Sequence, residues 1–162
     1  AELGVAVPLV DVARRRAPQT LDQQPEVAEV AEVAEVADGA WGRGLELMDQ
    51  VYGPGFSDNV PETAEPYLTE TVEHLFGDIW SRPGLSVRDR RLLTMGVGAS
   101  LGRTDLIRIQ ARGALHNHEM TPDQLREAVL HLAYYVGWCN ATAAQQGVAD
   151  AITDISATTK AQ

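Results

Sequence analysis

Paired helix-start and helix-stop signals between residues 80 and 140 constrain the fold of this chain more than any other feature of its sequence. Ser86 stands three residues before Asp89, a spacing in which side-chain oxygens accept hydrogen bonds from the open amides of a first helical turn. Gly102 can adopt the left-handed conformation that ends a helix. These signals predict one helix over about 86–101 and a second over about 104–117, joined in a tight hairpin.

A second start signal is the strongest in the chain. Thr121 supplies a capping hydroxyl, Pro122 suits the first helical position, and Gln124 can return a hydrogen bond from three residues after the cap. The apolar residues that follow recur at helical spacing on one face: Leu125, Ala128, Val129, Leu132, Ala133 and Val136. This pattern predicts an amphipathic helix that packs its apolar face on a core.

Weaker patterns complete an all-helical prediction. We expect a short helix over about 43–52, ended by a Gly-Pro-Gly breaker, a longer one over about 62–79 and a last one over about 140–153. Leu93, Val97 and Leu101 recur at four-residue spacing, as on one face of a helix. No segment alternates as a strand would. The predicted fold is all-α, a compact orthogonal bundle of about six helices.

The first forty residues differ from the rest. Glu-Val-Ala is repeated four times over residues 26–37, and valines at every third position wind around a helix instead of forming one apolar face. We therefore predict a low-complexity acidic tail over 1–40, either flexible or ordered against a neighbouring subunit. A helical domain over 41–155 and a short C-terminal tail over 156–162 would follow.

Composition excludes several classes of function. A net charge of −10 over 162 residues argues against binding a phosphate backbone, which requires a basic surface. No apolar run approaches the length of a membrane span, and the N-terminus lacks the order of a signal peptide, so we expect a cytoplasmic protein. The single cysteine, Cys139, cannot form an internal disulfide or a thiolate metal cluster.

Two helix faces carry candidate binding residues. Arg108, Arg112 and His116 form a basic strip that could hold a carboxylate or pair with acids of another subunit. His116 and His118 point about 200° apart on a helix, so we expect no shared metal. On the helix after Pro122, a polar-aromatic strip could line a pocket or a subunit interface: Glu127, His131, Tyr134 and Trp138.

Four blocks in order resemble the carboxymuconolactone decarboxylase family, in its gamma-carboxymuconolactone decarboxylase-like branch. They are GLELMDQVYG at 44–53, FGDIWSRPGLSVRDRRLLT at 76–94, LGRTDLIRIQARGAL at 101–115 and TPDQLREAVLHLAYYVG at 121–137. The resemblance implies an all-helical subunit that assembles as a homo-oligomer, a trimer or hexamer. It also implies cofactor-independent loss of carbon dioxide from an unsaturated lactone acid, with proton delivery to the resulting carbon.

The chain departs from the family at the positions of its reactive residues. Where the peroxidase branch has two cysteines and a histidine, this chain has Arg103, Leu106 and Gln110, so we expect no thiol peroxidase activity. The decarboxylases commonly have histidine at the position of Gln110, and glutamine cannot exchange a proton near neutral pH. We therefore expect a diverged substrate and a proton donor elsewhere, among the imidazoles. The predicted catalytic residues are His116, Gln110 and His131, and the predicted substrate-binding residues are His74, Trp80, Arg82, Arg90, Arg112, Tyr134 and Trp138.

Two functions follow from these observations. The first is a carboxy-lyase, or an enzyme of proton-transfer rearrangement, that needs no metal or cofactor and acts on an unsaturated carboxylic acid, lactone or polyketide-like molecule. The second is a non-catalytic oligomer of the same fold that binds a small ligand or scaffolds partner proteins. An enzyme should lose turnover but keep its assembly when Gln110 or His116 is changed to alanine, whereas a binding protein has no turnover to lose.

Overall fold

A computed structural model describes residues 27–61 and 65–160, and every regular element among them is helical. The elements are α1 (Val27–Tyr52), the 3₁₀ turn η1 (Ser57–Asn59), α2 (Pro66–Thr69), the π-helix η2 (Glu70–Trp80), α3 (Val87–Ser100), α4 (Thr104–His116), α5 (Pro122–Val136) and α6 (Trp138–Lys160). The all-α prediction is thus confirmed for this part of the chain. None of the helices described here has the length and hydropathy to cross a bilayer.

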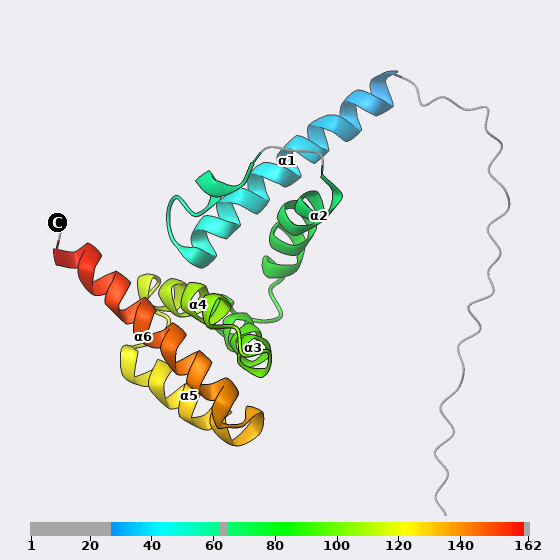
Figure 1. Cartoon of the computed structure of the whole chain (residues 1–162). Coiled ribbons are helices and arrows are strands. Elements are labelled where there is room, and N and C mark those ends of the chain that lie inside the picture. Colours follow the sequence, from blue (N-terminus) through cyan, green and yellow to red (C-terminus); the bar gives the residue numbers. More distant parts are fainter. Residues whose placement is uncertain (1–26, 62–64, 161–162) are drawn as a thin grey trace, which may run out of the picture.

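The helices form two groups, each with its own apolar cluster (Figure 1). In the first group α1 packs against η2 around Met48, Val51, Val72, Phe76 and Trp80. In the second, α3 to α6 enclose a cluster that includes Met95, Ile107, Leu125, Val129 and Val148. The two groups meet where α1 contacts α4. The C-terminal end of α1, at Tyr52, therefore lies at the junction between them.

The predicted helix-start signals of α3 and α5 are confirmed. Ser86 Oγ accepts a hydrogen bond from the Asp89 amide at 3.1 Å. Thr121 and Gln124 form the reciprocal capping box, with the two bonds at 3.2 and 2.9 Å. Gly102 has φ +63°, the left-handed conformation expected at the end of α3. Short polar side chains at fixed spacing thus set these boundaries locally.

Three helices differ from the predicted bounds. Helix α1 begins at Val27 rather than near residue 43 and runs through the Glu-Val-Ala repeat, because alanine and glutamate favour helix even without one apolar face. The prediction for residues 1–26 lies outside the described residues. The helix predicted over 62–79 consists of α2 and the π-helix η2. Helix α6 begins at Trp138, after Gly137 at φ +81°, and extends to Lys160, so Trp138 does not share a helix with His131.

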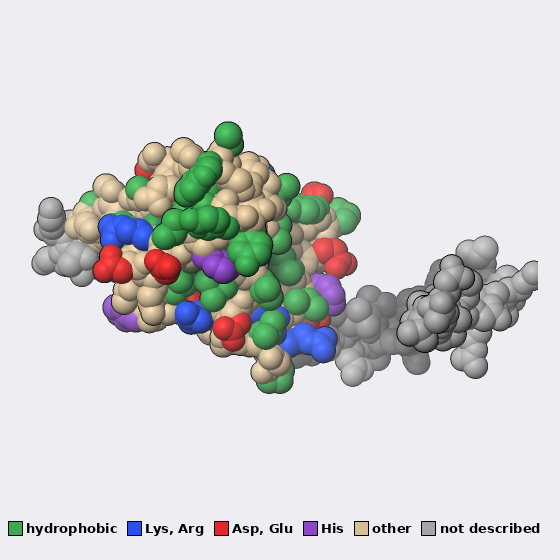
Figure 2. Space-filling model, turned by 90° about the horizontal axis from the view of Figure 1, so that it is seen from below, with side chains coloured by type: hydrophobic (Ala, Val, Ile, Leu, Met, Phe, Trp, Pro, Cys, Tyr) green, Lys and Arg blue, Asp and Glu red, His purple; other side chains and the backbone are tan. Residues whose placement is uncertain are grey.

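The face of α3 that carries its large aliphatic side chains is exposed. Leu93, Val97 and Leu101 are 63%, 59% and 64% exposed, whereas Met95 and Ala99 are buried. In the view of Figure 2, hydrophobic side chains gather on the visible face of the molecule. The large exposed apolar side chains also include Leu130, Tyr134, Tyr135 and Trp138, from α5 and the start of α6. The described part of the chain therefore leaves apolar surface uncovered.

Candidate active site

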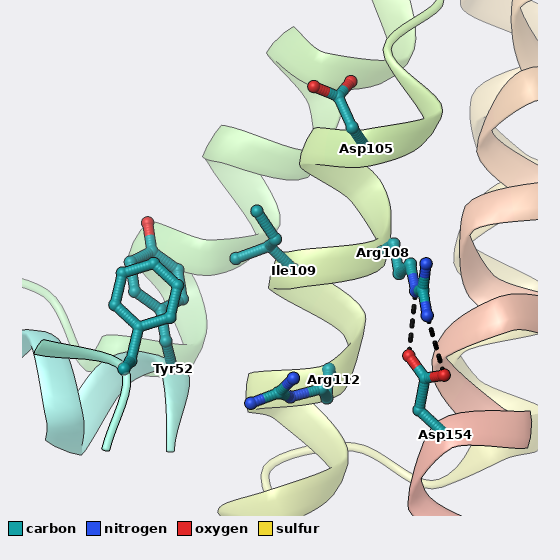
Figure 3. A pocket seen from close by; sticks show the side chains of 7 residues that line it. Tyr52, Asp105, Arg108, Ile109, Arg112 and Asp154 are labelled. Carbon is teal, nitrogen blue, oxygen red and sulfur yellow. Dashed lines mark hydrogen bonds and ion pairs between the residues drawn. The ribbon is translucent and has the colours of Figure 1, made fainter. Parts of the chain in front are cut away.

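A cavity of about 290 Å³ opens where the end of α1 meets α4 and α6 (Figure 3). Its lining residues are Tyr52, Phe56, Asp105, Arg108, Ile109, Arg112 and Asp154. A second cavity of about 400 Å³ shares Tyr52, Arg112 and Asp154 with the first and adds His116 to the lining. Because three residues line both, the two cavities adjoin each other, and we call the pair the hollow; together they offer room for a small organic molecule.

Some of the charged groups that line the hollow form ion pairs and others do not. Arg108 donates to both carboxylate oxygens of Asp154 at 2.8 Å, and this pairing lowers the pKa of Asp154. Asp105 accepts from Arg103, which lowers its pKa to about 2. Arg112 makes no hydrogen bond or ion pair with the residues that the structure describes, and Figure 3 shows it on the side of α4 that faces Tyr52. The charge of Arg112 also helps to lower the pKa of Asp154, but its N–H donors are not used by the described residues and are open to an anionic ligand.

An apolar wall faces this cation. The Tyr52 and Phe56 rings lie 4.5 Å apart between centroids, and the Tyr52 ring also meets the edge of Phe76 at 5.7 Å. Ile109 projects from α4 toward the same side (Figure 3). A ligand in the hollow would thus have charge on one side and hydrocarbon on the other, an arrangement suited to holding a charged group while removing water from its neighbour.

Behind the apolar wall, Tyr52 is connected to buried polar groups. The Gln110 Nε2 donates to the Tyr52 hydroxyl oxygen at 3.1 Å, and Gln110 Oε1 accepts from Arg91 Nη1 at 3.0 Å. Burial raises the pKa of the Tyr52 phenol, and the hydrogen bond from Gln110 opposes that effect. Gln110 is itself buried, so it does not form the surface of the hollow.

Arg91 is the centre of this network. Its side chain is 0% exposed, and Glu119 accepts from its Nε at 2.7 Å and its Nη2 at 3.0 Å. The remaining donors reach the Gln110 carbonyl, Gln110 Oε1 and the Val51 carbonyl, so all five N–H groups have acceptors. A buried guanidinium with every donor used cannot bind a ligand, and its contribution must be to position its neighbours.

The structure brings two of the predicted site residues to the hollow and a third next to it. Arg112 lines both cavities, His116 lines the larger one, and Gln110 lies behind Tyr52. The His116 ring packs beside Gly53, where an added Cβ would be 3.5 Å from His116 Cδ2. The basic strip of α4 is therefore divided, since Arg108 is paired with α6 while Arg112 and His116 face the hollow.

The other predicted site residues lie elsewhere. His74 pairs with Asp78 on the exposed face of η2, and Trp80 is buried in the α1–η2 cluster. The Arg82 carbonyl accepts from Arg90, whose Nε is buried without a described partner. On α5 and α6, His131 contacts Tyr135, Tyr134 contacts Trp138, and Trp138 lines a separate cavity of about 220 Å³. The polar-aromatic strip thus does not face the hollow beside Arg112.

Sequence reasoning missed Tyr52, Phe56 and the Arg91–Glu119 pair. Tyr52 and Phe56 flank the Gly-Pro-Gly breaker, which by itself indicates only the end of a helix. Arg91 stands four residues before Met95, on the buried face of α3. A charged residue in register with buried positions is the signal that could have indicated a polar network in the core.

Comparison with known proteins places the chain in a family. The sequence profile of the carboxymuconolactone decarboxylase family matches residues 66–150, which is more than half of the chain. The chain belongs to the carboxymuconolactone decarboxylase family. It is 31% identical over 117 residues to a 4-carboxymuconolactone decarboxylase of Acinetobacter baylyi, which covers 70% of this chain and 87% of that protein. It is 33% identical over 98 residues to a nitrosuccinic acid decarboxylase of Metarhizium robertsii, covering 58% of this chain and 68% of that protein.

The part of the chain that matches the family profile includes Arg112 and His116. Tyr52 lies before the matched part, at the end of α1. Across the described residues, no three or more side chains of His, Cys, Asp or Glu gather closely enough to hold a metal ion. Besides the two ion-paired carboxylates and Arg108, the groups that line the hollow are the Arg112 guanidinium, a phenol, an imidazole and hydrocarbon.

Proposed function

We propose that this chain is a cofactor-independent decarboxylase of a small organic acid whose own structure accepts the electron pair left by carbon dioxide. The observation that carries the proposal is one hollow in which unpaired Arg112 faces Tyr52, with Phe56 and Ile109 beside them. The names of the two relatives support it, since both are decarboxylases. The substrate class is an unsaturated, lactone or nitro acid that carries a second acidic group.

In this proposal Arg112 binds the group that remains on the substrate, not the carboxylate that leaves. An ion pair with the departing carboxylate would stabilise the reactant, because carbon dioxide carries no charge to keep that interaction. The departing carboxylate instead lies against Phe56 and Ile109. There it loses water, which favours its conversion to neutral carbon dioxide.

The reaction needs one bond cleavage and one proton. The bond between the carboxylate carbon and its neighbour breaks, carbon dioxide leaves, and the bonding electrons move into the unsaturated, lactone or nitro group of the substrate. The resulting carbanionic carbon then takes a proton from the His116 imidazolium, which water recharges. Imidazole suits this step because it gains and loses a proton near neutral pH.

The experiment is incubation of the full chain with 4-carboxymuconolactone, nitrosuccinic acid and related unsaturated, keto and lactone acids, following carbon dioxide release and product mass. Arg112→Ala should raise KM about 10–100-fold, since a hydrogen bond to a charged group contributes about 1.5–3 kcal/mol. His116→Asn should lower kcat about 10²–10⁴-fold. Arg126→Ala, on exposed α5, is the matched control and should change neither constant. Binding of these acids without any turnover would instead favour the non-catalytic function.

We also propose that the subunit assembles with copies of itself. Leu93, Val97 and Leu101 form an exposed apolar row along α3 and its C-cap, and such rows are uncommon on monomers unless they bind something. Tyr134, Tyr135 and Trp138 add aromatic surface of the kind enriched in subunit interfaces. Light scattering on the purified chain tests this proposal, and a monomer at all concentrations would contradict it.

A further inference from the structure

The hydrogen bonds from Arg91 to Tyr52 have a direction that is fixed by chemistry. A guanidinium can only donate, so the Gln110 atom 3.0 Å from Arg91 Nη1 must be the carbonyl oxygen. The other end of that carboxamide is then the NH₂ group, which faces the Tyr52 oxygen at 3.1 Å. Gln110 cannot turn its amide over without bringing two donors together at Arg91. Tyr52 must therefore accept the hydrogen bond from Gln110.

Because Tyr52 accepts from Gln110, its own hydroxyl proton is not used in that hydrogen bond. The phenol carries one proton, and none of the residues that the structure describes accepts it. The Tyr52 side chain lines both parts of the hollow, opposite Arg112. The residues that the structure describes thus leave this proton to water or a ligand. A neutral phenol held in this way keeps its one hydrogen-bond donor for an acceptor at the wall of the hollow.

We propose that Arg91, acting through Gln110, holds the Tyr52 hydroxyl as a hydrogen-bond donor to the oxyanion that develops on the substrate as carbon dioxide leaves. The inference rests on the proposed decarboxylase function and adds a catalytic residue to it. Tyr52 is the group that touches the substrate, and Gln110 and Arg91 are positioning residues. The recipient is the lactone, enolate or nitronate oxygen on which negative charge accumulates.

One isosteric change reverses the direction of the network. In Gln110→Glu, both carboxylate oxygens accept, so one oxygen keeps the bond from Arg91 and the other takes the proton of Tyr52. The donor to the substrate is thereby lost while the contact with Arg91 is kept. Tyr52→Phe removes the same donor directly. Gln145→Glu and Tyr67→Phe carry the same chemical changes at exposed positions away from the hollow and serve as controls.

The kinetic test uses the full chain with 4-carboxymuconolactone and nitrosuccinic acid. Gln110→Glu and Tyr52→Phe should each lower kcat about 10²–10³-fold, the usual loss for one oxyanion donor, with KM nearly constant. The double variant should lose no more than either single variant, because both changes remove the same hydrogen bond. Wild-type turnover by Gln110→Glu, or effects that multiply in the double variant, would overturn the inference.

A second readout separates this inference from the proposed function. With ¹³Cζ-labelled tyrosine, Tyr52→Phe identifies the Tyr52 resonance among the four tyrosines. At neutral pH and without substrate, Gln110→Glu should move that resonance toward the phenolate position, because the hydroxyl now donates to a carboxylate. A shift without turnover of any acid would retain the network and refute the decarboxylase proposal. An unmoved resonance would refute the network.

Discussion

The buried pair Arg91–Glu119 gives the sharpest stability prediction. Glu119→Gln keeps the shape of the side chain and removes its charge. Glu119 now accepts from two of the five donors of Arg91, at 2.7 and 3.0 Å, and Asn117 also donates to it at 3.0 Å. A carboxamide has one accepting oxygen, so its NH₂ group would face a donor of Arg91 in either orientation, and in one of them the Asn117 donor as well.

The magnitude follows from the burial of the pair. Arg91 is 0% exposed and Glu119 is 12% exposed, so Arg91 would remain charged with almost no water to replace its counter-ion. Breaking a buried pair by removing one partner costs about 3–5 kcal/mol. For a chain of this size that loss corresponds to a fall in Tm of about 6–20 °C.

The assay is urea unfolding followed by circular dichroism, with Glu127→Gln as control. Glu127 is exposed on α5, and its change should stay within about 0.5 kcal/mol. Replacing both partners, as Arg91→Met with Glu119→Leu, should recover much of the lost stability, because neither variant side chain leaves a buried charge. A loss below about 1 kcal/mol in Glu119→Gln would refute the reasoning that Arg91 depends on this carboxylate.

Three further predictions concern packing, acid stability and assembly. Gly113→Ala should destabilise the fold by about 1–3 kcal/mol in urea unfolding, because the added Cβ would stand 2.7 Å from Arg91 Nη1; an unchanged midpoint would contradict this. Arg103 lowers the pKa of Asp105 from 3.8 to about 2, so the stabilisation from this pair is present above about pH 4 and is lost as the pH falls through 2. Asp105→Asn should remove that part of the acid dependence of unfolding. Acid unfolding curves that superimpose for the two proteins would show that the pair does not form in solution. Val97→Glu should lower the mass measured by light scattering without lowering helix content, and an unchanged mass would place the interface elsewhere.

Helix positions in the second half of the chain could be predicted because their signals are local. The Ser86 and Thr121 caps and the turn at Gly102 depend on residues within three or four positions, and the structure has them as predicted. The start of α1 could not be predicted, because the repeat before residue 40 has helix-forming composition but no apolar face. Absence of amphipathicity indicated the lack of a packed core and not the lack of a helix.

The sequence by itself determined the fold class, the family and the presence of a cationic strip on α4. Those features follow from short-range spacing and from ordered blocks of residues. Only the tertiary structure decided which of those cations can bind a ligand. Arg108 forms an ion pair with Asp154, 46 residues away in the sequence, whereas Arg112 does not. It also decided that Tyr52, Gln110 and Arg91 are hydrogen-bonded in one network, because they come from three helices and the bonds form only when α1 and α3 both pack on α4. Spacing along a chain specifies what lies on one helix face, whereas contacts between helices depend on how those faces pack.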